Sequence, residues 1–374
     1  MIYLDNAGTT KVLPECAELY LKYQTENFYN PSAPYHPALE LSKEIKEVRE
    51  KAVALLRGRG KIIFTSSGSE SDNLALFGCK KAKNSRIIVS TSEHPAVYNC
   101  ANELLQRGYD VVFCPVDNTG RVIREEFEKL MTKEVSLVSI MHVNNETGCI
   151  NDIKTLCSIA KKAYPDVIFH SDGVQAVGKI KVNLQDLGVD LYTISGHKIH
   201  GVKGVAGLFV KEGVNLHPLI FGGGQEFGVR SSTENVGGIL SFGRALERAV
   251  SCAESEKDRM VEMWDDLSKF FKEMGFYVVE SEKHSPYILC AAMPKVRGEV
   301  MLHSLEKYEV YIGTGSACSS KKTTKKLPAI LQLSPELEKG IIRISFSRFT
   351  TKDDIEYFKN CIKKEYIELL RYVQ

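Results

Sequence analysis

Hydrophobic and polar positions alternate along residues 39–210 with two different periods. Apolar side chains recur at helical spacing over residues 39–55, and Gly58 follows as a helix stop. Short apolar runs, typical of strands buried on both faces, alternate with further helical patterns. We therefore predict an α/β fold whose mostly parallel sheet is covered by helices on both faces. The predicted strands are residues 62–64, 87–90, 111–113, 136–141, 167–170, 191–194 and 205–210, and the predicted helices between them include residues 73–80 and 96–106.

The pattern changes after about residue 250. A helical pattern over residues 262–274 is followed by shorter elements, and the last helix opens on Thr351-Lys352-Asp353-Asp354, which is typical of a capping box. The other predicted elements here are strands at residues 277–279, 287–291 and 341–346 and a helix at residues 299–307. We interpret residues 14–250 as a large domain, and residues 1–13 together with 251–374 as a smaller α+β domain.

The composition is that of a soluble globular protein. Of the residues, 43% are hydrophobic and 26% are charged. The length of 374 residues is enough for two or three domains with their own cores. The net charge of +2 gives no reason to expect direct nucleic-acid binding. No segment has the apolar length of a membrane span or the pattern of a secretion signal, so we expect a cytoplasmic protein. The ten cysteines form no CxxC pair or ligand cluster, so we expect reduced thiols and no metal site.

Three polar clusters follow predicted strands, at residues 65–73, 171–175 and 195–203. Open α/β sheets bind ligands beyond the carboxyl ends of their strands, so this convergence predicts an active site. The first cluster, rich in serine, suits either a phosphate or an ordinary helix N-cap, and it lacks the lysine of a P-loop. Lys198 in the third cluster is either an amine nucleophile or a surface lysine. Asp172 needs a partner such as a protonated pyridine nitrogen, unless it is an N-cap.

An ordered set of motifs spans nearly the whole chain and carries a resemblance to a known family. The motifs are Tyr3-Leu4-Asp5-Asn6, Asn30-Pro31-Ser32, Ser67-Gly68-Ser69-Glu70-Ser71-Asp72-Asn73, Glu93-His94, Asn144-Asn145-Glu146, Asp172-Gly173-Val174-Gln175, Ser195-Gly196-His197-Lys198, Gly222-Gly223-Gly224-Gln225-Glu226, Arg230-Ser231-Ser232-Thr233 and Gly315-Ser316-Ala317-Cys318. The set resembles the cysteine desulfurases of the NifS/IscS group, within the class V aminotransferase superfamily. That resemblance implies the fold type I of enzymes that use pyridoxal 5'-phosphate.

The resemblance also implies a role for each matched residue around that cofactor. Lys198 corresponds to the lysine that forms the internal aldimine, Asp172 to the carboxylate facing the pyridine nitrogen, and Gln175 to the donor to the ring hydroxyl. His94 corresponds to the histidine that stacks on the ring and moves protons. The residues corresponding to phosphate ligands are Gly68, Ser69, Ser195, His197 and, from a second subunit, Thr233, which implies a homodimer.

For the substrate, the resemblance implies L-cysteine. Arg343 corresponds to the arginine that binds the substrate carboxylate, because a planar guanidinium can bind a carboxylate bidentately. Asn145 corresponds to a residue that lies near the cofactor and the substrate carboxylate in the family. Asn30 also corresponds to a substrate-binding residue of the family. Cys318 corresponds to the nucleophile, on a loop of the small domain. It would take the sulfur as a persulfide, release L-alanine and pass the sulfur to an acceptor protein.

The sequence does not decide which protein accepts the sulfur, and it leaves other activities as alternatives. Lysines 321, 322, 325 and 326 follow Cys318, which is similar to relatives that supply tRNA-thiolation enzymes, whereas an iron–sulfur scaffold is the other acceptor that the family implies. The run either docks an acidic acceptor or is a solvated loop. Selenocysteine lyase is the nearest alternative activity, and another class V enzyme would need no Cys318. A silent scaffold would not need Lys198, and a Cys/His hydrolase would explain neither Lys198 nor Asp172.

Overall fold

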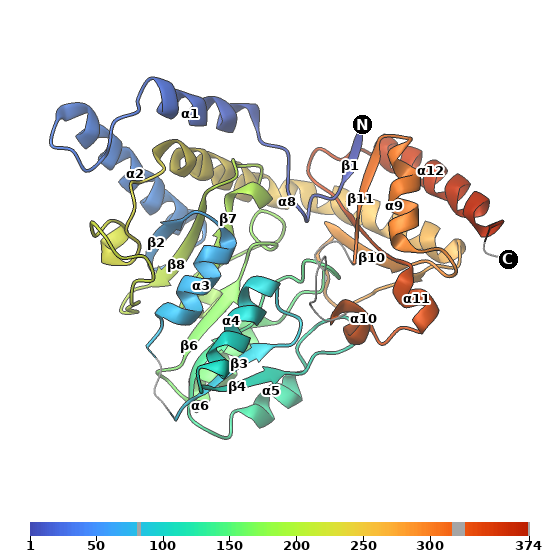
Figure 1. Cartoon of the computed structure of the whole chain (residues 1–374), viewed down its shortest axis with the longest axis horizontal. Coiled ribbons are helices and arrows are strands. Elements are labelled where there is room, and N and C mark those ends of the chain that lie inside the picture. Colours follow the sequence, from blue (N-terminus) through green and yellow to red (C-terminus); the bar gives the residue numbers. More distant parts are fainter. Residues whose placement is uncertain (81–83, 316–325, 373–374) are drawn as a thin grey trace.

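The computed structural model contains two β-sheets, each with its own helices (Figure 1). It describes residues 1–80, 84–315 and 326–372, without the side chain of Lys326. The larger sheet has, in spatial order, β2 (Gly60–Thr65), β8 (Ala206–Lys211), β7 (Leu191–Ser195), β6 (Ile168–Asp172), β5 (Val135–Ser139), β3 (Arg86–Ser90) and β4 (Asp110–Cys114). All neighbouring pairs are parallel except those that β8 makes with β2 and β7. The predicted α/β class is confirmed, with one antiparallel strand inside the sheet.

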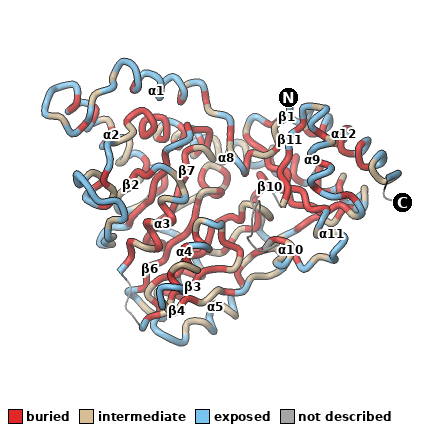
Figure 2. The backbone as a smooth tube through the Cα atoms, viewed as in Figure 1, coloured by how far each residue is buried: buried red, intermediate tan, exposed pale blue. Residues whose placement is uncertain are grey.

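Helices cover both faces of this sheet because alternate strand residues point to opposite sides. Ile62 packs into one core with residues of α2 (His36–Leu55), α5 (Arg124–Leu130), α6 (Ile153–Ala163) and α8 (Val236–Glu273). Ile63 packs into another core with residues of α3 (Gly68–Gly78) and α4 (Pro95–Gln106). Figure 2 shows the strands buried between these layers. The helices of this part are α1 (Pro14–Thr25), α2 (His36–Leu55), α3 (Gly68–Gly78), α4 (Pro95–Gln106), α5 (Arg124–Leu130), α6 (Ile153–Ala163) and α7 (Leu184–Leu187), with short 3-10 turns at Gly196–Lys198 and Glu226–Gly228.

The smaller sheet has five strands in the order β1 (Ile2–Leu4), β11 (Val310–Thr314), β12 (Ile341–Ser345), β10 (Ile288–Ala292) and β9 (Tyr277–Val278). β1 brings the start of the chain beside β11, in a parallel pairing, and the other pairs are antiparallel. Its helices are α9 (Gly298–Glu306), α10 (Lys326–Leu331), α11 (Pro335–Lys339) and α12 (Lys352–Leu370). Trp264, Phe271 and Phe358 belong to the core under this sheet.

A single long helix joins the two sheets. Helix α8 (Val236–Glu273) is 38 residues long and contributes to the cores of both parts. It runs through residue 250, where we divide the chain into domains, so that division stays a prediction. No helix among the described residues combines the length and the apolar character needed to cross a membrane.

The predicted start of one helix needs correction, and two strands were not predicted. We expected a helix from residue 73, whereas α3 begins at Gly68 because the Ser67 side chain caps it, with Oγ accepting from Glu70 N at 3.1 Å. The strand pattern after residue 340 and the capping box are confirmed, since Thr351 Oγ1 accepts from Asp354 N and the Asp354 side chain accepts from Thr351 N. The sequence pattern did not reveal β1 or β11.

Candidate active site

The carboxyl ends of β6 and β7 bring the second and third polar clusters together. Asp172 is the last residue of β6, Ser195 is the last residue of the neighbouring β7, and Lys198 lies in the 3-10 turn that follows. Gly68 starts α3, and a methyl group built on it would lie 3.6 Å from Ser195 Cβ. The three clusters therefore meet at one edge of the sheet, as the sequence predicts.

Asp172 is a buried carboxylate at this edge. Its Oδ1 accepts from Val174 N at 2.9 Å. Burial raises the pKa of Asp172 to about 6, although the Val174 N–H and the charge of Lys198 both lower it. Behind it, the buried His170 lies 3.6 Å from Asp72, whose own pKa is raised by burial and by Asp172. A cationic partner in front of Asp172 would favour its ionised form.

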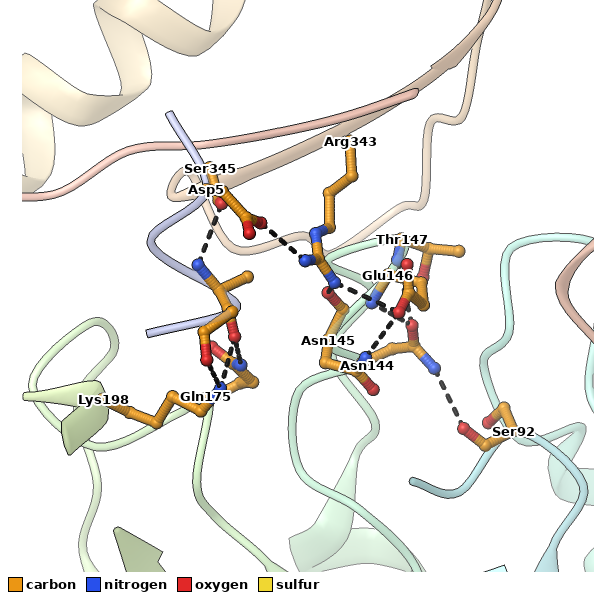
Figure 3. Close-up of polar contacts among 12 residues, drawn as sticks. Asp5, Ser92, Asn144, Asn145, Glu146, Thr147, Gln175, Lys198, Arg343 and Ser345 are labelled. Carbon is orange, nitrogen blue, oxygen red and sulfur yellow. Dashed lines mark hydrogen bonds and ion pairs between the residues drawn. The ribbon is translucent and has the colours of Figure 1, made fainter. Parts of the chain in front are cut away.

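The N-terminal segment closes over Lys198 (Figure 3). The Lys198 amine donates to Ala7 O at 2.5 Å and to Gly8 O at 2.6 Å. The buried Gln175 donates from Nε2 to the same Ala7 carbonyl at 2.9 Å. Lys198 and Gln175 therefore point toward the backbone of residues 7–8, which lies outside the three polar clusters.

Arg343 reaches the same segment from the small sheet. Its guanidinium donates from Nη2 to Asp5 Oδ1 at 2.7 Å and from Nη1 to Glu146 Oε1 at 3.1 Å and Asn145 O at 3.0 Å (Figure 3). The Asn145 side chain also donates to Glu146 at 2.8 Å. Burial raises the pKa of Glu146, and the Arg343 charge lowers it. The structure thus brings together Asn145 and Arg343, two of the three predicted substrate residues.

Sequence reasoning missed the two carboxylates that hold Arg343. Asp5 and Glu146 both stand inside motifs that carry the resemblance, but nothing in those motifs shows a shared partner. The signal available was their type: an acidic residue in each of two motifs, and an arginine that needs a counter-charge. Their distance along the chain from Arg343, 338 and 197 residues, hides the contact.

His94 is the N-cap of α4, where its Nδ1 accepts from Ala96 N at 3.2 Å. A neutral imidazole that accepts at Nδ1 carries its proton on Nε2, so the backbone selects the tautomer. His197 makes a comparable contact, with Nδ1 3.0 Å from Thr9 Oγ1. Burial and, to a smaller extent, the charge of Lys198 lower the pKa of His197 to about 4, so this imidazole is neutral near pH 7.

Two predicted site residues have no printed contact with this group among the described residues, and a third lies outside them. Asn30 is exposed between α1 and α2, with Oδ1 accepting from Ser32 N at 3.0 Å. Thr233 is exposed on the loop before α8, as a residue assigned to a neighbouring subunit's site would be. Cys318 lies outside the described residues, and so do lysines 321, 322 and 325.

Comparison with known proteins decides the family. The model of the family described as Aminotransferase class-V matches residues 2–358. The chain is a member of the class V aminotransferase family. It is 38% identical to a protein named Cysteine desulfurase IscS from Dictyoglomus turgidum, in an alignment that covers 100% of this chain and 96% of that protein. It is 37% identical to a NifS/IcsS protein homolog from Lactobacillus delbrueckii, in an alignment that covers 96% of this chain and 95% of that protein.

Solved structures agree with this membership of the class V family. A structure titled NIFS-LIKE PROTEIN superimposes with a TM-score of 0.91 at 32% identity, with 99% of each chain covered. A NifS-like protein from Rickettsia africae gives a TM-score of 0.86 at 30% identity, with 98% of this chain and 99% of that chain covered. The predicted NifS/IscS resemblance and the type I fold are confirmed.

The class V family implies pyridoxal phosphate, and the residues present fit it. Within the described part of the chain, the buried Ser195 Oγ has no hydrogen-bond partner, beside the α3 N-terminus whose N–H groups favour an anion. Asp172 and Gln175 offer a carboxylate and an amide to a pyridine ring. Lys198 offers the amine that would bond the carbonyl carbon. Among the described residues, no cluster of three His, Cys, Asp or Glu could hold a metal ion.

Proposed function

We propose that this protein is a pyridoxal-phosphate-dependent cysteine desulfurase that transfers sulfur from L-cysteine to Cys318. The observation that carries the proposal is the meeting of Lys198, Gln175 and Arg343 on one segment. Residues 5–8 accept from Lys198 and Gln175 through backbone carbonyls and from Arg343 through the Asp5 carboxylate. A cofactor-binding lysine and a carboxylate-binding arginine are thereby held on two sides of one site.

Pyridoxal phosphate bound here would supply a ring that accepts electrons from the substrate's α-carbon. Asp172 would keep the pyridine nitrogen protonated, and that positive charge would in turn lower the pKa of Asp172 from about 6. Gly68, Ser69, Ser195 and His197, with Thr233 of a second subunit, would bind the phosphate. Gln175 would donate to the ring hydroxyl.

Two groups would move protons in this proposal. Lys198 would supply the amine that removes the α-proton, and this amine donates to the carbonyls of Ala7 and Gly8. His94 keeps a proton on Nε2, because the Ala96 N–H occupies Nδ1. That N–H can donate a hydrogen bond to the substrate, and proton transfer by His94, the role that the family implies, would run through Nε2.

Arg343 would bind the substrate carboxylate, assisted by Asn145 and, on family grounds, Asn30. The Asp5 and Glu146 carboxylates fix the guanidinium plane before substrate arrives, which reduces the ordering that binding must supply. In the transfer itself, the C–S bond of cysteine breaks and an S–S bond to Cys318 forms. The thiol of Cys318 becomes a persulfide, and the hydrogen that balances the change appears in the methyl group of alanine.

The first experiment incubates pyridoxal-loaded protein with L-cysteine and a dithiol reductant, and measures sulfide and alanine together. Equimolar release supports the proposal. No release of either product from loaded protein would overturn it. Release from selenocysteine alone would point to a selenocysteine lyase.

Replacing Cys318 by Ser tests the sulfur acceptor within the protein. We expect the visible absorbance of the bound cofactor, and its change on adding L-cysteine, to be kept, while sulfide release falls to background. Cys252→Ser is the matched control, because Cys252 is a half-buried thiol on α8. Full sulfide release by Cys318→Ser would contradict the assignment.

The proposal includes a homodimer in which each subunit completes the other's site. Thr233 is exposed, and the preceding loop carries Phe221 and Phe227 with 81% and 58% of their surface exposed, which is typical of a surface that a partner covers. Mixing inactive Lys198→Ala and Thr233→Ala chains should restore one complete site per mixed dimer. No recovery after mixing, with a dimer present by sedimentation, would contradict shared sites.

For the final acceptor we propose a protein with an acidic surface, either a tRNA-thiolation enzyme or an iron–sulfur scaffold. The support is the sequence alone, in the lysines at 321, 322, 325 and 326. Replacing these four by Ser should slow persulfide transfer to such an acceptor while sulfide release to a small dithiol is kept. Unchanged transfer to both would remove this interpretation.

A further inference from the structure

Gln175 lies between two neighbours that determine which way its amide faces. Its Nε2 donates to Ala7 O at 2.9 Å, and its Oε1 accepts from the amine of Lys179. A backbone carbonyl can only accept, so the nitrogen must face Ala7 and the oxygen must face Lys179. The hydrogen-bonding partners therefore identify which end of the Gln175 amide is nitrogen and which is oxygen.

Local backbone structure puts Lys179 beside Gln175. Residues 173–180 form consecutive turns, in which Val177 N donates to Gly173 O at 3.1 Å and Ile180 N donates to Ala176 O at 3.0 Å. Side chains four residues apart lie on the same side of such turns. Lys179 thus reaches back over one turn to Gln175.

Burial makes this lysine unusual. Only 8% of Lys179 is exposed, and within the described residues its amine makes no ion pair with a carboxylate. Burial lowers the pKa of Lys179 to about 7, and the charges of Lys198 and Arg343 contribute in the same direction. A buried amine without a counter-ion costs free energy that an apolar side chain of similar length would avoid. Filling space therefore does not account for a lysine here.

We propose that Lys179 is a positioning residue, which fixes the Gln175 amide so that Nε2 faces the ring hydroxyl of pyridoxal phosphate. This inference rests on the proposed function. One Nε2 hydrogen is used by Ala7, and the second remains for the ring oxygen. Without Lys179, the Ala7 carbonyl alone would hold this orientation, and any amide that turned would present Oε1, which favours a protonated ring oxygen over an ionised one.

The test uses Lys179→Met in the full-length protein loaded with pyridoxal phosphate. The readout is the ratio of the visible to the near-ultraviolet absorbance band of the bound cofactor, which follows ionisation of the ring hydroxyl. We expect this ratio to fall by about tenfold, as for the loss of one good hydrogen bond. Lys181→Met is the matched control, because Lys181 is exposed two residues further on. It should leave the ratio unchanged.

A double-mutant cycle separates positioning from a general structural effect. If Lys179 acts through Gln175, Lys179→Met should change the ratio in the native background and change nothing further in a Gln175→Ala background. Equal effects in both backgrounds, or an unchanged ratio in Lys179→Met, would overturn the proposal. Native protein that fails to bind pyridoxal phosphate would instead refute the proposed function itself, so the two failures are distinct.

Discussion

At the residue scale, the site depends on charges held by partners that lie far away in the chain. Arg343 is 6% exposed and carries two carboxylate partners, Asp5 and Glu146. A guanidinium can contact both and still present an edge to a substrate carboxylate, because its five N–H groups lie in one plane. A lysine at this position would keep the positive charge but could not donate two parallel hydrogen bonds to a carboxylate.

We therefore expect Arg343→Lys to raise the KM for L-cysteine by roughly tenfold to a hundredfold, the size expected for losing one charge-assisted hydrogen bond. Cofactor absorbance should be unchanged. The measurement is steady-state alanine release, with Arg124→Lys as control, since Arg124 pairs on the exposed surface with Glu128. An unaltered KM would show that another group binds the carboxylate.

Sequence could supply the types of the site residues but not all of their contacts. Asp172, Gln175 and Lys198 follow predicted strands, so their convergence can be derived from the rule for parallel sheets. Asp5 and Lys179 could not be found in this way. Asp5 acts across 338 residues of chain, and Lys179 looks like a surface lysine until the turns around Gly173 bury it.

At the element scale, one buried ion pair holds three elements together. Arg49 of α2 donates to both carboxylate oxygens of Glu226, at 2.6 Å and 2.9 Å, and Glu226 also accepts from Phe64 N of β2 at 2.9 Å. Side-chain exposure is 13% for Arg49 and 4% for Glu226. The pair thus joins α2 and the sheet edge to the 3-10 turn at Glu226–Gly228, where Glu226 itself has a φ of 48°.

Replacing Arg49 by Met should lower the free energy of unfolding by about 3–5 kcal/mol, because it leaves a buried carboxylate without its counter-ion. Lys51→Met is the comparison, since the exposed pair of Lys51 with Glu247 should contribute about 0–1 kcal/mol. Urea denaturation measures both. Equal losses in the two variants would show that burial of the Arg49 pair has no special effect.

Helix α8 and strand β1 differ from what the hydrophobic pattern predicted. Helix α8 is continuous over 38 residues, although we recognised a helix only from residue 262. Its first turns are apolar on all sides, since Val236, Ile239, Leu240 and Phe242 are all buried, and so lack the one-sided pattern of a surface helix. Strand β1 has only three residues, too few for a period-two pattern to be recognised.

At the scale of the whole molecule, buried histidines link stability to pH. Burial lowers the pKa of His142 from its ordinary value of 6.5 to about 4. Between these values the unfolded chain binds a proton that the folded chain does not. The free energy of unfolding therefore loses a contribution from His142 as pH falls from about 6.5 to about 4, by up to 1.4 kcal/mol per pH unit.

His142→Gln should reduce this pH slope by about one proton. Tyr192→Phe is the control, because it removes the 2.7 Å contact between His142 Nδ1 and the Tyr192 hydroxyl but keeps the imidazole. The measurement is denaturation at several pH values between 4 and 7. An identical slope in His142→Gln and native protein would contradict a neutral buried imidazole.

The pairing of β1 with β11 sets the order in which the site can be completed during synthesis. Ile2 pairs with Val310, and Asp5 contacts Arg343, so these early residues must wait for partners that are synthesised about three hundred residues later. The seven-stranded sheet needs nothing beyond Lys211 to have all its strands, and it can form while later segments are still being made. A nascent chain that has added α8 to this sheet can therefore hold Lys198 in place before Arg343 is synthesised. On the proposed function, the arginine that binds the substrate carboxylate is made after Lys198, Asp172 and Gln175.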